Sequence, residues 1–204
     1  MAAAGEALTT FVALLRGVNV GKAKRVPMAD LRALLAGLGY TDVTTLLNSG
    51  NAVFRAGKGS SARHAADIAA AIAAQLAVDV PVIVKSQREL ARIVTENPIA
   101  AREEQHSRFL VAFVQDGKAL PGIATIAALV VPAEQFAVGG DAAYLLCAAG
   151  ILDSKAGEAL LGKAGRAATT RNWATVLKLL ALASGHETRA STDHKEWEHA
   201  FQRK

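Results

Sequence analysis

The chain has 204 residues, a net charge of +5, 51% hydrophobic residues and only 5% aromatic residues. This composition predicts a globular protein with a substantial buried core and excludes an intrinsically disordered chain. The sequence begins without the basic and apolar segments of a signal peptide, and no apolar run approaches the roughly 18 to 20 residues that a membrane-spanning helix needs. A single cysteine excludes an intramolecular disulfide, so we expect a cytoplasmic protein with no membrane association.

The charge permits several classes of partner. A net charge of +5 allows acidic metabolites or nucleic acid to bind and requires neither. The low aromatic content disfavours single-stranded nucleic acid, which is usually bound on stacking platforms, without excluding it. The run Gly17–Lys22 has one residue too few between its glycines for a phosphate-binding P-loop, and no dinucleotide fingerprint follows the strand. We therefore predict no cofactor, and the scattered histidines predict no metal site.

The first predicted elements are a strand, a basic loop and a helix. Residues Phe11–Leu15 are continuously apolar, the pattern of a strand that is covered on both faces. The loop Arg16–Arg25 holds four basic residues and no acid. Pro27 suits the first turn of a helix, and Gly39 suits its left-handed end. Val26 falls at the expected cap position, where its side chain has no acceptor for the free helix amides.

Further elements complete a recognisable order. The next predictions are a strand, a turn, a strand, a helix and a fourth strand, which gives the ferredoxin-like order β-α-β-β-α-β. In chain order they are Val43–Leu47, Asn48–Asn51, Ala52–Phe54, a helix that buries Ile68, Ile72 and Leu76, and Val78–Val84. Ser86 and Glu89 then form a capping box at the start of another helix.

The second half is predicted to repeat this pattern without its last strand. The predicted elements are a strand over Phe109–Val114, a helical segment over Leu120–Ala128, strands over Glu134–Val138 and Ala143–Ala148, and a helix over Ser154–Leu161. The final helix is predicted to begin near Thr169 or Thr170. The predicted fold is therefore α+β, with two ferredoxin-like β-α-β-β-α halves, mixed sheets and a C-terminal helix packed on them. We assign residues 8–85 to the first half, 86–106 to a connecting helix and polar linker, 107–185 to the second half with the C-terminal helix, and 186–204 to a polar tail.

Topology suggests a binding site in the first half. If the two strands joined by the first helix share a sheet, a right-handed crossover makes them parallel and puts their carboxyl ends on one edge, where ligands often bind. The basic loop, the uncapped helix start and the Asn48–Asn51 turn would meet there and form an anion cradle. The alternative is a solvated basic loop, with Asp30 offsetting the helix dipole. The candidate ligand-binding residues are Arg16, Asn19, Lys22, Lys24, Arg25, Asn48, Ser49 and Asn51.

Additional candidates lie nearer the carboxyl terminus. A cation in the first turn of a helix opposes the helix dipole, so Arg171 predicts a compensating carboxylate or a bound anion. A purely structural ion pair is the alternative. Arg171 would close the site if the last helix docks against the same edge. The candidates in this part of the chain are Ser154, Lys155, Thr170, Arg171 and Asn172.

Three segments together resemble a widespread bacterial family known as domain of unknown function 1697. They are LLRGVNVG…VPMADLRALLAGLGY…LNSGNAVF from Leu14 to Phe54, the helix end Glu96–Pro98, and ATTRNWATVLKL from Ala168 to Leu179. The resemblance implies an α+β fold of two ferredoxin-like halves and implies no activity. The chain departs from the family pattern at Asp153, which stands where an arginine is usual, so an anion contact at that position is not carried over.

The leading functional hypothesis is a module that binds a small anionic, phosphorylated ligand at the edge described above. A second hypothesis is an enzyme that acts on an anionic metabolite with Lys22 or Lys155 as acid, base or charge clamp. A nucleic-acid-binding module and a protein-interaction module are further alternatives. The oligomeric state is left open.

Overall fold

The computed structural model describes residues 8–21, 24–57 and 59–185. Two ferredoxin-like halves make up this part of the chain, and each contains one four-stranded sheet. The candidate residue Lys22 and the polar tail 186–204 lie outside the described residues.

The first half forms a sheet in the order β2-β3-β1-β4, and its elements follow one another in the predicted β-α-β-β-α-β order. They are β1 (Thr9–Leu15), α1 (Met28–Gly37), β2 (Thr41–Leu46), β3 (Asn51–Ala56), α2 (Ser61–Leu76) and β4 (Val82–Ser86). Because β1 and β2 are each antiparallel to β3, they run in the same direction. Their carboxyl ends therefore lie on one edge of the sheet, as the sequence predicts.

The central strand of the first sheet is covered on both faces. Alternate side chains of a strand point to opposite faces, so Phe11, Ala13 and Leu15 join the cluster beneath α1 and α2. Val12 and Leu14 point the other way, into a second cluster. The continuous apolar run of β1 is explained by this double burial.

The second half repeats the sheet in the order β6-β7-β5-β8. Its elements are β5 (Phe109–Val114), α4 (Leu120–Ala124), a 3-10 helix η3 (Thr125–Leu129), β6 (Gln135–Val138), β7 (Ala142–Leu146), α5 (Lys155–Leu161) and β8 (Ala168–Asn172). Two further 3-10 helices flank β5, namely η1 (Glu103–Arg108) and η2 (Gly117–Ala119). The order of strands matches that of the first sheet position by position.

Two expectations about the sheets were wrong. The second half does have a last strand, because residues 168–172 pair with β5 as β8, and the final helix occupies residues 173–185. The two threonines favour a helix cap in isolation, but tertiary pairing on a buried strand decides their conformation. The sheets were also expected to be mixed, whereas all pairings between the described strands are antiparallel. β1 and β2 run in the same direction but are not neighbours, because β3 lies between them.

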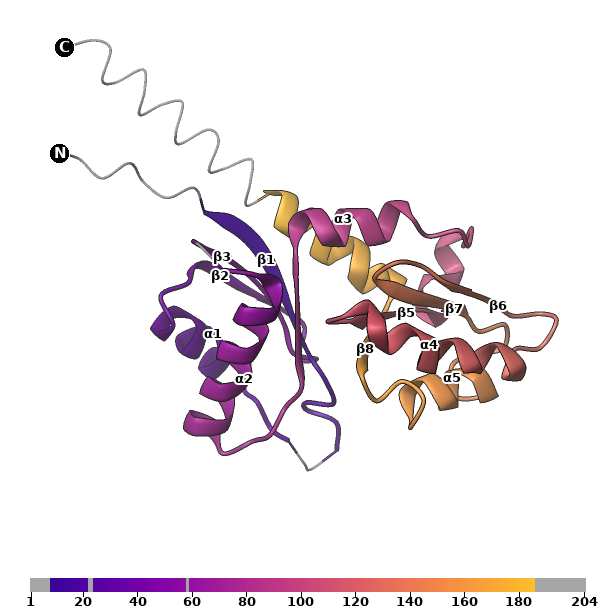
Figure 1. Cartoon of the computed structure of the whole chain (residues 1–204), viewed down its shortest axis with the longest axis horizontal. Helices are drawn as coiled ribbons and strands as arrows, with labels where there is room; N and C mark the ends of the chain where they lie inside the picture. The colour runs from indigo at the N-terminus through magenta and orange to yellow at the C-terminus, as the bar shows by residue number, and fades with distance from the viewer. Residues whose placement is uncertain (1–7, 22–23, 58, 186–204) are drawn as a thin grey trace, which may run out of the picture.

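The two sheets share one hydrophobic core. Inner-face residues of both sheets cluster with α3 (Gln87–Thr95) and with the final helix, whose Trp173 stacks on Phe109 with ring centroids 5.0 Å apart. Separate clusters lie between the first sheet and α1 and α2, and between the second sheet and α4 and α5. Figure 1 shows this arrangement, with α3 and the yellow final helix lying beside each other. Because the central core draws on both halves, their relative position is fixed by apolar packing.

The last strands of the two sheets also correspond residue by residue. Ser86 and Asn172 each cap the following helix, since each side-chain oxygen accepts a hydrogen bond from the backbone N–H three residues on, at 3.2 and 2.9 Å. The residues just before them, Lys85 and Arg171, each pair with a valine of the first strand of their sheet. The structural repeat therefore includes the last strand of each sheet, and in both halves a cation precedes the helix cap.

Candidate functional site

Asn19 joins the three segments that the sequence predicts to meet. Its side-chain N–H donates to the carbonyl oxygen of Val26 at 2.9 Å and to that of Asn48 at 2.7 Å, and its Oδ1 accepts from the Val26 N–H at 3.0 Å. Asn19 has a left-handed backbone with φ 57°, a conformation that asparagine tolerates better than most residues. These bonds hold the loop after β1 against both the start of α1 and the turn between β2 and β3.

A pocket of about 570 Å³ lies where these segments meet, and we call it the rim pocket. Its lining residues come from the loop, the helix start and the turn: Asn19, Gly21, Arg25, Pro27, Met28, Ala29 and Asn48. Arg25 is exposed, and its guanidinium has no hydrogen-bond or ion-pair partner among the described residues. No carboxylate is among the lining residues. The pocket is therefore a volume with an unneutralised cation at its wall.

The start of α1 adds free hydrogen-bond donors to this pocket. Pro27 takes the cap position instead of the expected Val26, and it makes no side-chain cap bond. The first helical N–H with a backbone acceptor is that of Leu31, so the N–H groups of Met28 and Ala29 have no acceptor in the described chain. Asp30 follows in the first turn, where its charge partly offsets the helix dipole, but it does not line the pocket.

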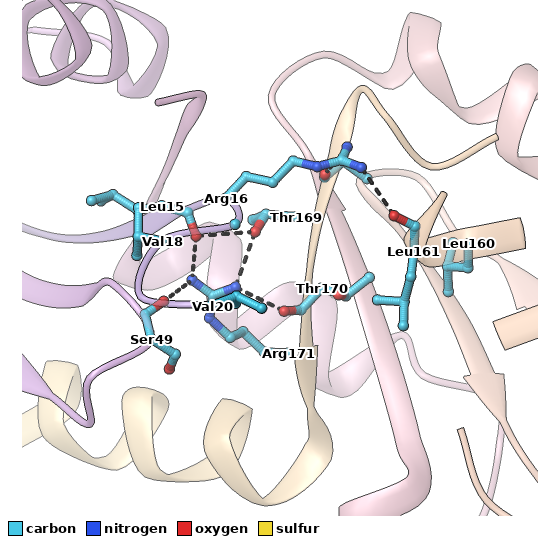
Figure 2. Close-up of a pocket in the computed structure, with 12 residues that line it drawn as sticks. Leu15, Arg16, Val18, Val20, Ser49, Leu160, Leu161, Thr169, Thr170 and Arg171 are labelled. Carbon is cyan, nitrogen blue, oxygen red and sulfur yellow. Dashed lines mark hydrogen bonds between the residues drawn. The ribbon is translucent and has the colours of Figure 1, made fainter. Parts of the chain in front are cut away.

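A second pocket, of about 260 Å³, lies between the two halves, and we call it the cleft pocket (Figure 2). Like the rim pocket, it borders the loop after β1. Its lining combines the end of β1 and the following loop with α5 and β8: Leu15, Arg16, Gly17, Val18, Val20, Ser49, Leu160, Leu161, Ala168, Thr169, Thr170 and Arg171. Two arginines and no acid line this pocket.

Arg171 ties β8 to the first half through oxygen acceptors instead of a carboxylate. Its side chain is buried, and burial lowers the pKa of its guanidinium to about 10. No ion pair with another described residue neutralises it. Its donors instead reach the side-chain oxygens of Asn51 and Thr169 and the carbonyl oxygens of Leu15, Ser49, Gly50 and Thr170. Figure 2 shows the guanidinium enclosed by several of these groups.

Arg16 also links the two halves: it follows β1 of the first half and donates to carbonyl oxygens of the second half. Its Nη1 donates to the carbonyl oxygens of Gly165 and Ala168, at 2.5 and 2.8 Å. Its Nη2 donates to those of Leu161 and Gly162, at 3.2 and 3.4 Å, at the carboxyl end of α5, where a cation is favoured by the helix dipole. Partial burial lowers the pKa of Arg16. Arg16 is thus engaged in holding the halves together.

The remaining candidate residues stabilise turns and helix starts or lie away from both pockets. Asn51 is fully buried and donates to the Leu46 carbonyl and the Ser49 hydroxyl, both at 2.9 Å, so it holds the turn from within. Asn172 caps the final helix through its side-chain oxygen and lines neither pocket. Ser154 caps α5, and Lys155 is the exposed first residue of that helix; neither lines the rim pocket or the cleft pocket.

A buried cation between the halves was not predicted from the sequence. Lys85 of β4 is 1% exposed, and its Nζ lies 3.6 Å from Oδ1 of Asp141 in the turn between β6 and β7. Arg92 also pairs with Asp141, from α3. The available signal was the position of Lys85 directly after the apolar run of the predicted strand Val78–Val84. A lysine that is fully buried there needs a partner, because lysine is rarely fully buried without one.

The described residues also bear on metal binding and on membrane insertion. They contain no group of three or more histidine, cysteine, aspartate or glutamate side chains placed to hold a metal ion. Among the helices formed by the same residues, none has the length and apolar character needed to cross a membrane.

The comparisons with known proteins identify the family. The family model described as "Protein of unknown function (DUF1697)" matches residues 8–144. The chain belongs to this family. It is similar to the solved structure of the conserved bacterial protein SP0830 from Streptococcus pneumoniae, with 25% sequence identity and a TM-score of 0.73 over 87% of this chain and 99% of that chain. No curated protein matches the chain. Neither description names a ligand or a reaction.

Proposed function

We propose that this protein binds a small anionic, phosphorylated ligand in the rim pocket. The proposal depends most on one observation: Arg25, which has no partner in the described chain, lines a pocket together with the free amides at the uncapped start of α1. A helix start attracts anions because its N–H groups lack acceptors and the helix dipole is positive there.

The lining of the pocket favours an anion over a neutral ligand. Among the described lining residues, Arg25 has the only charged side chain and none is acidic. A guanidinium matches the oxygens of a phosphate well because it presents donors in a planar fork. Lys24 is exposed in the same loop and adds positive charge nearby. Lys22, outside the described residues, stays a candidate for the same role.

The size of the pocket and the polarity of Asn48 favour an organic phosphate. A volume of about 570 Å³ lies within the range of about 300–1,000 Å³ typical of small-molecule sites. The Asn48 side chain makes no hydrogen bond within the described chain, so it has both a donor and an acceptor to offer to a sugar or amide group. Pro27 and Met28 provide an apolar wall. These features together suit a phosphorylated metabolite better than a free inorganic ion.

The proposal is binding and not catalysis, because the rim pocket has no described side chain suited to proton transfer near neutral pH. Its charged residue is an arginine, which stays protonated. Lys155, considered above as an acid, base or clamp, lies at the start of α5 and does not line the pocket.

A thermal-shift panel of phosphorylated metabolites tests the proposal. A ligand at about a hundred times its Kd should stabilise the folded protein by about 2.7 kcal/mol, and Arg25→Ala should abolish most of that gain. Lys118→Ala is the matched control, since Lys118 is an exposed cation in the corresponding loop after β5 and makes only a 3.9 Å contact with Asp116. A panel without any saturable stabilisation, or a gain that survives Arg25→Ala, would contradict the proposal.

A further inference from the structure

We infer that the cleft pocket is a second binding site, which takes a monocarboxylate with a short aliphatic body. The inference concerns the volume between the halves and does not depend on the phosphate proposed for the rim pocket. It rests on the charge, the free donors and the apolar walls of the cleft.

The cleft pocket contains positive charge that no carboxylate of the described residues neutralises. Arg171 is 8% exposed, lines the pocket and forms no ion pair with the described residues. The corresponding cation, Lys85, lies 3.6 Å from the carboxylate of Asp141. By the register of the two sheets, the position that corresponds to Asp141 is Gly50, which has no side chain. Burying a charge without a counter-ion is costly, and carbonyl dipoles stabilise the guanidinium without cancelling its net charge.

Gly50 could not supply the missing carboxylate. Its backbone has φ +74°, and a Cβ there would come within 2.6 Å of side-chain atoms of both Leu15 and Val18. Any counter-ion for Arg171 must therefore come from elsewhere. Arg16 adds a second cation to the same wall, although the carbonyl oxygens at the end of α5 already surround much of it. Two guanidinium groups without an acid among the described lining residues favour an anionic occupant, and the small volume of the cleft pocket favours a compact one.

Several donors in the lining lack acceptors in the described chain. The Thr170 hydroxyl makes no hydrogen bond, and the backbone N–H groups of Gly17 and Val18 have no acceptor. The Ser49 hydroxyl accepts from Asn51, and its own proton stays available for donation. A carboxylate has about four lone-pair sites, so this set of donors can satisfy both of its oxygens.

The other walls of the cleft are apolar. Val20 is 73% exposed and Leu161 46% exposed, and both line the pocket together with Leu160. A volume of about 260 Å³ lies just below the range of about 300–1,000 Å³ for ordinary small-molecule sites. The size and the walls therefore favour a short aliphatic body beside the carboxylate.

An NMR titration with matched acids and amides tests this inference. We expect butyrate and isovalerate, but not butyramide and isovaleramide, to cause saturable chemical-shift changes at the backbone amides of Gly17, Val18 and Thr170. Val20→Glu should weaken acid binding by about tenfold or more, because it puts a like charge at the exposed wall. Leu152→Glu is the control, since Leu152 is 96% exposed and does not line the cleft.

Three results would overturn the inference. They are no saturable change with either acid, equal binding of acids and amides, and unchanged affinity in the Val20→Glu variant. A phosphate response at Met28 and Ala29 in the same samples reports on the rim pocket alone, so failure of one site is distinguishable from failure of the other.

Discussion

A cation in the last strand of each half lies at the hairpin turn of the other half. The groups that it contacts differ between the two turns. Lys85 reaches the turn between β6 and β7 and meets the carboxylate of Asp141. Arg171 reaches the turn between β2 and β3 and meets only neutral oxygens, among them the carbonyls of Ser49 and Gly50. The same topology thus closes one junction with an ion pair and leaves the other with net positive charge.

This difference is one reason for placing both proposed sites beside the first of these turns. The turn between β2 and β3 borders both pockets: Asn48 lines the rim pocket and Ser49 lines the cleft pocket. Neither pocket has an acid among its lining residues. We therefore propose anionic ligands on the side of the first turn, whereas Asp141 already pairs with Lys85 and Arg92 at the second turn.

The largest effect is expected from removing Arg171. Arg171→Met should lower the free energy of unfolding by about 3 kcal/mol or more, because several buried oxygens lose their donor at once. Arg171→Lys should restore only part of this loss, because lysine has three donors and lacks the planar fork. Urea unfolding of the three proteins measures the effect. A loss below about 1 kcal/mol for Arg171→Met would mean that carbonyl contacts do not hold the junction.

A nearly equal effect is expected at Gly50. Gly50→Ala puts a Cβ within 2.6 Å of Leu15 and Val18 in a left-handed conformation, so we expect a loss of about 2–4 kcal/mol. Gly140→Ala is the control in the other turn, because a Cβ there meets only the Glu96 carboxylate at 3.9 Å. Comparable unfolding midpoints for the two variants would show that the first turn is not tightly packed.

A smaller effect is expected at Lys85. Lys85→Met removes a buried charge and keeps most of its volume, and Asp141 is left with Arg92 as a partner. We therefore expect a loss of about 1 kcal/mol, well below that of Arg171→Met. A double-mutant cycle with Asp141→Asn isolates the pair. If Lys85→Met cost as much as Arg171→Met, the contrast between the two junctions would be lost.

The smallest effect is expected from His64, in the outer cluster of the first half. Burial lowers the pKa of His64 below its ordinary value of 6.5, with a raising effect of Asp67 and a lowering effect of Arg63. Its Nδ1 lies 2.9 Å from the Tyr40 hydroxyl, and its buried Nε2 has no hydrogen-bond partner among the described residues. Below pH 6.5 His64 is protonated in the unfolded chain but still neutral in the folded chain. The free energy of unfolding should therefore fall as the pH falls toward the pKa of His64 in the folded protein.

Chemical unfolding across this pH window, in wild type and His64→Phe, checks the effect. The variant should have a flatter dependence of stability on pH. His106→Gln, in the polar segment before β5, is the control. Identical slopes for wild type and His64→Phe would contradict the assignment.

Much of the fold follows from periodicity and turn chemistry in the sequence. The two halves, the capping box at Ser86 and the meeting of the basic loop with Asn48 were all predicted from local patterns and strand direction. β8 was missed because a short edge strand with two threonines has the same composition as a helix cap. The partners of Arg171 could not be predicted because they are mostly backbone oxygens of distant residues, which a sequence pattern does not mark.

The most direct test of the account is an NMR titration of the wild-type protein with inorganic phosphate, following the backbone amides at the start of α1. We expect saturable shifts at Met28, Ala29 and Asp30 that are lost in Arg25→Glu and kept in Lys118→Glu, which changes an exposed cation in the segment after β5. If those amides do not respond, or respond equally in both variants, the first half does not contain an anion site at its rim.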